Sequence, residues 1–181
     1  MTDPMLWFAN RGTGVVLLVL LTLSTVLGVL SGARATNRIW PRMLSQGLHR
    51  NVSLLAVALL AAHAVTAVVD SFVDIRWWHA FVPFAGTYKT VWLGFGALAF
   101  DLLIAVTLTS MFRHRMSHRP WRAVHLLAYA AWGLGLFHGM QMGTDAVTVW
   151  GTAVNITSIG VVAVAVLARL GMLARSTVAT S

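Results

Sequence analysis

Long apolar runs are the feature that most constrains how this chain can fold. The segment from Gly14 to Gly32 carries no charged residue, and its length approaches the ~20 residues that an α-helix needs to cross the hydrocarbon layer. Only 10% of the residues are charged, whereas a soluble domain has about 25%. We therefore expect an all-α integral membrane protein in which residues 1–181 form one domain. Its five spans are predicted over residues 14–32, 48–69, 90–112, 123–142 and 146–170.

The charge and the cysteine content exclude several classes of site. The formal net charge of +8 could indicate nucleic-acid binding in a soluble protein. Here most basic residues lie in short links between apolar runs, where they set the orientation in the membrane. We therefore expect lipid as a partner and no nucleic acid. The absence of cysteine excludes disulfides, cysteine-bound zinc and cysteine-bound iron–sulfur clusters.

Basic residues are divided unevenly between the two ends of the predicted spans. The links after the first and third spans hold Arg34, Arg38, Arg42, Arg50, Arg113, Arg115, Arg119 and Arg122. The opposite links hold Arg76 and Lys89, together with Asp70, Asp74 and Asp145. Because basic links stay in the cytoplasm, we expect the N-terminus outside and the C-terminus in the cytoplasm. The expected location is a bacterial cytoplasmic membrane.

Four histidines lie within two of the predicted spans. His49 and His63 are fourteen residues apart in the second span, and His125 and His138 are thirteen apart in the fourth. At ~1.5 Å per residue the two separations are roughly 21 and 20 Å. The two spans run in the same direction, so His49 should face His125 and His63 should face His138. Each pair could supply both axial ligands of one haem iron, an arrangement suited to one-electron transfer. We therefore expect two b-type haems.

Helix geometry favours one pair of positions over the other. Fourteen residues return His63 to within ~40° of the face that carries His49, whereas thirteen leave His138 about 140° from His125. Glycines in the segment Gly133–Gly135 could allow a bend there. The alternative interpretation is that these histidines only form hydrogen bonds with neighbouring helices, as single membrane histidines often do.

A resemblance to a known family lies around these histidines, in the segments LHRNVSLLAVALLAAHAV and WRAVHLLAYAAWGLGLFHG. They resemble the ferric reductase-like transmembrane domain, a superfamily that includes ferric reductases, NADPH oxidases and the haem subunit of a bacterial periplasmic methionine sulfoxide reductase. The resemblance covers about residues 14–170, and it implies that the four histidines are haem ligands. The family commonly has six spans, and its oxidases add a flavin and NADPH domain. This chain has five predicted spans and no G-x-G-x-x-G turn within a βαβ unit.

The resemblance implies a dihaem cytochrome that carries electrons across the membrane as part of an oxidoreductase. Electrons would come from a separate flavoprotein or from quinol, and would pass to an extracytoplasmic acceptor. Two other functions fit the same sequence. One is a quinol-dependent cytochrome b subunit, and the other is a non-redox membrane scaffold or transporter subunit whose histidines make polar contacts.

Four further residues are candidates for supporting roles. Arg50 and Arg122 flank the cytoplasmic-side histidines and could neutralise haem propionates, since guanidinium matches carboxylate; alternatively they only set the topology. Asp101, in the middle of the third span, could relay protons or act as a structural hydrogen-bonding group. His79 is expected in an outer surface loop, where interfacial packing is the simplest role and binding of a metal or an electron acceptor is the alternative.

Overall fold

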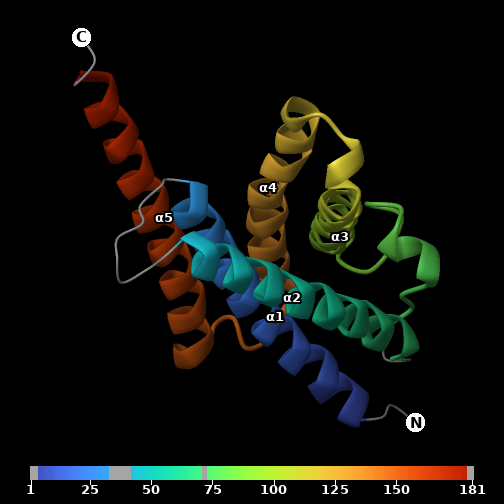
Figure 1. Ribbon diagram of the computed structural model, residues 1–181. Coiled ribbons are helices and arrows are strands. Elements are labelled where there is room, and N and C mark those ends of the chain that lie inside the picture. Colours follow the sequence, from blue (N-terminus) through green and yellow to red (C-terminus); the bar gives the residue numbers. More distant parts are fainter. Residues whose placement is uncertain (1–3, 33–41, 71–72, 179–181) are drawn as a thin grey trace.

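The computed structural model describes residues 4–32, 42–70 and 73–178, and within these ranges the chain is entirely helical, without strands. The five α-helices are α1 (Pro4–Gly32), α2 (Arg42–Val69), α3 (Thr90–Met111), α4 (His118–Met142) and α5 (Val149–Val178). Two short 3-10 helices, η1 (Trp77–Ala80) and η2 (Arg113–Arg115), precede α3 and α4 (Figure 1). The predicted all-α class is confirmed.

Four of the five α-helices, namely α1, α2, α3 and α5, are long and apolar enough to cross a membrane. The remaining helix, α4, has 25 residues and is the least apolar of the five. Its first turns contain His118, Arg119 and Arg122, and its length also includes two of the paired histidines. Insertion of α4 as a fifth span therefore stays a prediction, as does the orientation of the bundle.

Several helices extend beyond the apolar runs that predicted them. Helix α1 begins at Pro4, and α2 begins at Arg42 within the link that was expected to be polar. Hydropathy marks only the part of a helix that matches hydrocarbon, whereas backbone hydrogen bonding continues into polar surroundings. Helix α5 begins later than predicted, at Val149, because Thr148 first forms a turn with its N–H and its hydroxyl both donating to the Asp145 carbonyl (2.9 and 2.6 Å). Arg34 and Arg38 lie outside the described residues.

The helices form two closely packed pairs, α1 with α2 and α3 with α4. Helix α1 also contacts α4 and α5, and the indole N–H of Trp132 on α4 donates to the hydroxyl of Thr22 on α1 (3.0 Å). Helices α2 and α4 are not among the extensively packed pairs of the described chain. Helix α5 lies at one side of the molecule, and its C-terminal end extends away from the other helices (Figure 1). The two helices that carry the histidines therefore contact each other little in the described chain.

The segment between α2 and α3 folds back over α3. Phe84 has a φ of 66°, in the left-handed region that a bulky residue rarely adopts. Its ring lies where a β-carbon at Gly94 would be, so that position on α3 needs glycine. Phe81 packs against Phe100 with ring centroids 5.4 Å apart. These contacts place η1, and with it His79, against α3.

Candidate functional site

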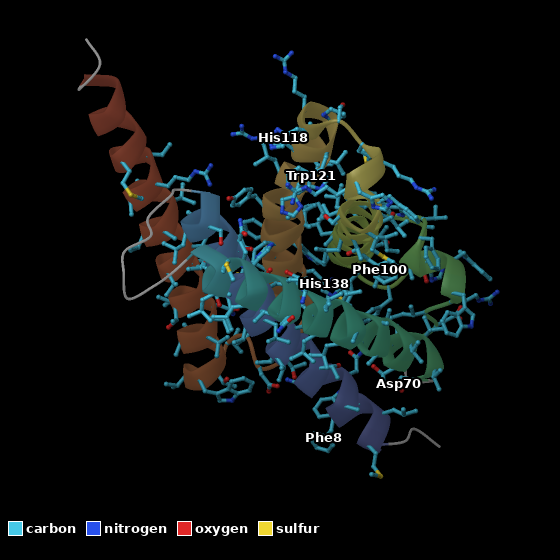
Figure 2. The ribbon with its side chains drawn as sticks, in the orientation of Figure 1. Phe8, Asp70, Phe100, His118, Trp121 and His138 are labelled. Atoms are coloured by element: carbon cyan, nitrogen blue, oxygen red, sulfur yellow. The ribbon has the colours of Figure 1, made fainter. Side chains whose placement is uncertain are left out.

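The four span histidines form two facing pairs between α2 and α4. The ring centroids of His49 and His125 are 6.1 Å apart with an interplanar angle of 75°. Those of His63 and His138 are 6.4 Å apart at 88°. The structure thus brings together the same partners that the spacing predicted. Figure 2 shows His138 on α4, further along this helix from its start at His118.

The separation within each pair is too long for a direct hydrogen bond between the rings, and none joins them in the described chain. Two imidazoles on one metal ion, with metal–nitrogen bonds of about 2 Å, would have ring centroids about 6 Å apart, because each centroid lies about 1 Å behind its nitrogen. Both pairs match that separation. Each gap therefore has the width that one coordinated metal atom requires.

Three of the four rings are held by a backbone carbonyl of the neighbouring helix. The acceptors are Ser24 O for His49 (2.9 Å), Asn10 O for His63 (3.1 Å) and Trp92 O for His138 (2.9 Å). A carbonyl oxygen can only accept, so Nδ1 of each ring must carry the hydrogen. The lone pair of Nε2 then remains free, which is the tautomer that a metal-binding histidine needs.

Each of these carbonyls precedes a glycine by four residues. Side chains on an α-helix lean towards its N-terminus, so the side chain at position i+4 lies over the carbonyl of residue i. Glycine leaves that carbonyl open to the imidazole. A β-carbon would lie 3.1 Å from His63 at Gly14, 3.3 Å from His49 at Gly28 and 2.5 Å from His138 at Gly96. The three glycines therefore make the space in which the rings bind.

The fourth ring, His125, is held differently. Its Nδ1 lies 3.4 Å from the hydroxyl oxygen of Ser110, and the Trp121 ring stacks on it with centroids 5.0 Å apart at 23°. Helix α4 is continuous from His118 to Met142 and contains Gly133 and Gly135, so a bend at these glycines stays a prediction. His125 thus reaches a side chain of α3 instead of a backbone carbonyl.

A sequence signal for these partners exists, although the sequence analysis missed it. On α1, Gly14 and Gly28 are fourteen residues apart, like the two histidines of α2 that they face. On α3, Gly96 and Ser110 repeat the same spacing opposite α4. Two small residues fourteen positions apart thus mark each helix that holds the rings, although the histidines of α4 are themselves thirteen apart.

The pair His63/His138, which the predicted orientation places on the outer side (the outer pair), lies beside a cavity of about 350 Å³. His63 and His138 line it, together with largely apolar side chains of α1, α3 and α4. Its polar lining residues include Asn10, His79 and Tyr88. A cavity of this size, mostly apolar with a few convergent polar groups, is typical of a cofactor or ligand site.

Comparison with known proteins assigns the part of the chain that carries this site to a family. Residues 5–145 match the family described as Domain of unknown function (DUF8596). The chain belongs to this family. The DUF8596 match includes α1 to α4, and so contains all four histidines and their partners on α1 and α3, but it ends before α5. No curated protein and no solved structure matches the chain. The resemblance to the ferric reductase-like domain stays a prediction.

Each histidine pair of this DUF8596 chain offers only two protein ligands, and this number restricts which metal could bind. In the described part of the chain, no group of three or more His, Cys, Asp or Glu side chains could hold a metal ion. A bare zinc ion normally takes three or four protein ligands. Haem iron needs only two from the protein when both axial positions are filled. Histidine pairs at this separation therefore suit a metal that brings its other ligands with it.

Around His49 and His125, which the predicted orientation places on the cytoplasmic side (the inner pair), Arg50 and Arg122 are exposed, and neither has a hydrogen bond or ion pair with another described residue. Two residues that were not predicted as site residues, Arg113 and Trp121, also lie there. The guanidinium of Arg113 lies 4.4 Å from the Trp121 ring centroid, and the indole nitrogen Nε1 of Trp121 is buried without a hydrogen-bond partner. A buried donor without a partner indicates space for an acceptor that the protein itself does not supply.

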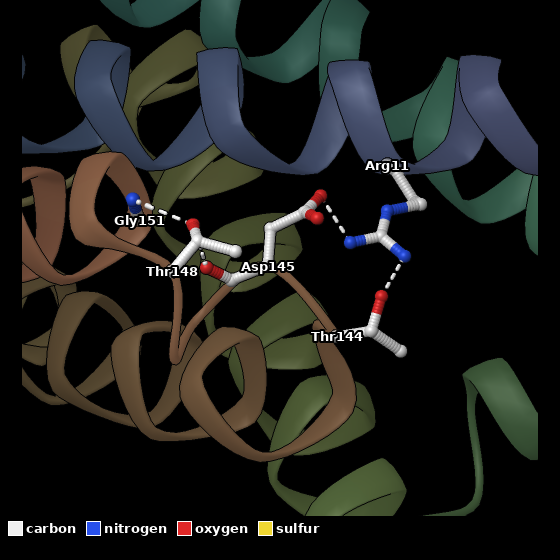
Figure 3. Close-up of polar contacts among 5 residues, drawn as sticks. All are labelled: Arg11, Thr144, Asp145, Thr148 and Gly151. Atoms are coloured by element: carbon white, nitrogen blue, oxygen red, sulfur yellow. Dashed lines mark hydrogen bonds and ion pairs between the residues drawn. The ribbon is translucent and has the colours of Figure 1, made fainter.

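Near His63 and His138, the structure corrects the expected exposure of His79 and adds a contact of Arg11. His79 is not a surface residue: it is only 8% exposed, because the η1 segment folds onto α3. Arg11 on α1 forms an ion pair with Asp145 and donates a hydrogen bond to Thr144, as Figure 3 shows. This contact between α1 and the α4–α5 link was not predicted from the sequence.

Asp101 is half-buried on α3 and has no hydrogen bond or ion pair with another described residue.

Proposed function

We propose that this protein binds two b-type haems, one between His49 and His125 and one between His63 and His138, and conducts electrons between the two faces of a membrane. The observation that carries the proposal is the pairing of the rings at 6.1 and 6.4 Å. That separation, and the anchoring of Nδ1 in three of the four rings, agree with two axial ligands for one iron.

When bound, an iron with two imidazole ligands supplies one-electron transfer and has no open position for a substrate. The protein's part is to hold and orient these ligands. The carbonyls of Asn10, Ser24 and Trp92 fix the tautomer of their histidines and increase the basicity of Nε2. Apolar helices around the pairs provide surroundings of low dielectric constant, which tune the reduction potential.

The distribution of charge supports a direction for the electrons. The inner pair lies near the basic start of α4, with Arg113 stacked on Trp121, whereas the outer pair lies towards Asp70 and Asp145. Because basic ends of spans stay in the cytoplasm, electrons enter at His49 and His125 and leave from His63 and His138. The donor is a separate flavoprotein or quinol, and the acceptor is extracytoplasmic. The proposed location is a bacterial cytoplasmic membrane.

The test is an absorption spectrum of the purified protein, reduced minus oxidised. We expect a b-type α band that loses about half of its amplitude in His63→Ala or His138→Ala. The matched control is His114→Ala, since His114 is an exposed histidine of η2, and its spectrum should equal that of the wild type. A folded, colourless wild-type protein would exclude haem binding.

A further inference from the structure

A buried histidine outside the two pairs lines the outer cavity. His79 belongs to η1 and is only 8% exposed, and it lines the cavity together with His63 and His138. Burial of a polar side chain costs free energy unless the group finds a hydrogen-bond partner. Among the described residues, one of its two ring nitrogens has such a partner, and the other has none.

The partner of Nδ1 determines what the other nitrogen can do. The backbone N–H of Arg76 donates to Nδ1 of His79 (3.1 Å), so Nδ1 carries no hydrogen. In the neutral ring the hydrogen is therefore on Nε2, which can only donate. Nε2 has no hydrogen-bond partner among the residues that the structure describes. His79 therefore offers one fixed N–H donor.

The packing around His79 covers the Nδ1 edge of its ring. A β-carbon at Gly86 would lie 3.6 Å from Nδ1 and 3.8 Å from Cγ, so the backbone of Gly86 covers the opposite edge of the ring. Trp78 packs on the ring edge to face, with centroids 5.4 Å apart. His79 lines the space that it shares with His63 and His138, and its Nε2 edge is not the edge that Gly86 covers.

The cationic side chains at this end already have partners. Arg11 is paired with Asp145, Arg76 with Asp74 (3.1 Å), and the ammonium of Lys89 donates to the carbonyl of Gln141 (2.7 Å). Tyr88 also lines the cavity, but it is 38% exposed. Among the described residues, His79 and Asn155 (9% exposed) are therefore the buried side-chain donors that line the cavity without a hydrogen-bond partner, and His79 is the one that lies in η1.

We propose that Nε2–H of His79 binds a propionate carboxylate of the haem held by His63 and His138. A carboxylate in apolar surroundings needs a donor, and hydrogen bonds to charged groups are the stronger ones. By partly neutralising the negative charge, the donor favours the reduced iron and raises the reduction potential of this haem only. The inference rests on the proposed function.

The test is a redox titration of the purified holoprotein, followed by its absorption, for the wild type, His79→Phe and His79→Gln. Phenylalanine keeps the ring but removes the donor, whereas the glutamine amide can still donate. We expect the midpoint potential of one haem to fall in His79→Phe while that of the other is unchanged. His79→Gln should stay near the wild type, as should the control variant His114→Phe at an exposed position.

The outcomes separate this inference from the proposed function. A wild-type protein without haem would overturn the proposed function itself. Two haems in the wild type, with both potentials unchanged in His79→Phe, would overturn only the role of His79. An equal fall in His79→Phe and His79→Gln would also overturn it, since packing and not the N–H would then be the cause. Loss of one haem in His79→Phe, with both retained in His79→Gln, would support it.

Discussion

At the scale of single residues, the position of three histidine rings depends on a glycine of the neighbouring helix, which leaves a backbone carbonyl uncovered. His138 donates to the Trp92 carbonyl because Gly96 has no side chain to cover that oxygen. The same relation holds for His49 and His63 on α1. Ring position, tautomer and helix packing are therefore coupled at each of these sites, and the space is tightest at Gly96, where a β-carbon would overlap the His138 ring.

Gly96→Val tests this coupling. Even the β-carbon of a side chain at this position would lie 2.5 Å from Nδ1 of His138. We therefore expect the ring to be displaced and the outer haem to be lost. The haem content should fall from about two to about one per chain, as measured by pyridine haemochrome absorption. Gly133→Val is the matched control, because nothing lies within 4 Å of a β-carbon there. Unchanged haem content in Gly96→Val would contradict the coupling.

The sequence predicted the histidine partners but not the groups that hold them. Spacing along one helix is enough to match His49 with His125 and His63 with His138, because depth in a helix follows from residue number. Which carbonyl a ring reaches depends on how α1 docks on α2 and α3 on α4, which hydropathy does not reveal. Burial of His79 depends likewise on the fold of an irregular segment around Phe84 and Gly94.

At the scale of helices, Arg11 connects α1 to the link between α4 and α5 through Asp145 and Thr144 (Figure 3). The Arg11 side chain is 14% exposed, and that of Asp145 is 36% exposed. Removing one partner of a fully buried pair costs about 3–5 kcal/mol, whereas exposed pairs contribute at most about 1 kcal/mol. This partly exposed pair lies between those limits.

A double-mutant cycle measures this contact. We expect Arg11→Ala and Asp145→Ala each to lower the free energy of unfolding in detergent by about 1–2 kcal/mol. The double variant should lose less than the sum, with a coupling energy of about 1 kcal/mol. Additive losses would mean that the ion pair does not stabilise the native helix arrangement. The sequence could not predict this pair, since the two residues are far apart in the chain and each looks like an ordinary surface charge.

At the scale of the whole molecule, charge and apolar surface together predict how the protein lies in a membrane. Large apolar side chains such as Leu54 (56% exposed), Val164 (67%) and Leu167 (66%) are exposed on the outside of the helices. Lipid would cover them, as it covers the surface of other membrane helices. Hydropathy alone was enough to predict the helical class, but the less apolar α4 shows where that signal becomes weak.

Labelling of single cysteines tests the orientation, and the chain contains no cysteine of its own. Thr87→Cys and Ser117→Cys place a thiol at exposed positions near opposite ends of α3. In intact cells a membrane-impermeant maleimide should label the cysteine at 87, whereas the cysteine at 117 should react only after permeabilisation. The opposite pattern would reverse the direction of electron flow.

The most direct measurement of the central claim is the number of haems that each histidine pair holds. Purified wild-type protein should contain about two haems per chain, and each double variant, His49→Ala/His125→Ala or His63→Ala/His138→Ala, should contain about one. The variant that lacks all four histidines should contain none. A wild-type protein with no haem, or double variants that keep both haems, would contradict the account.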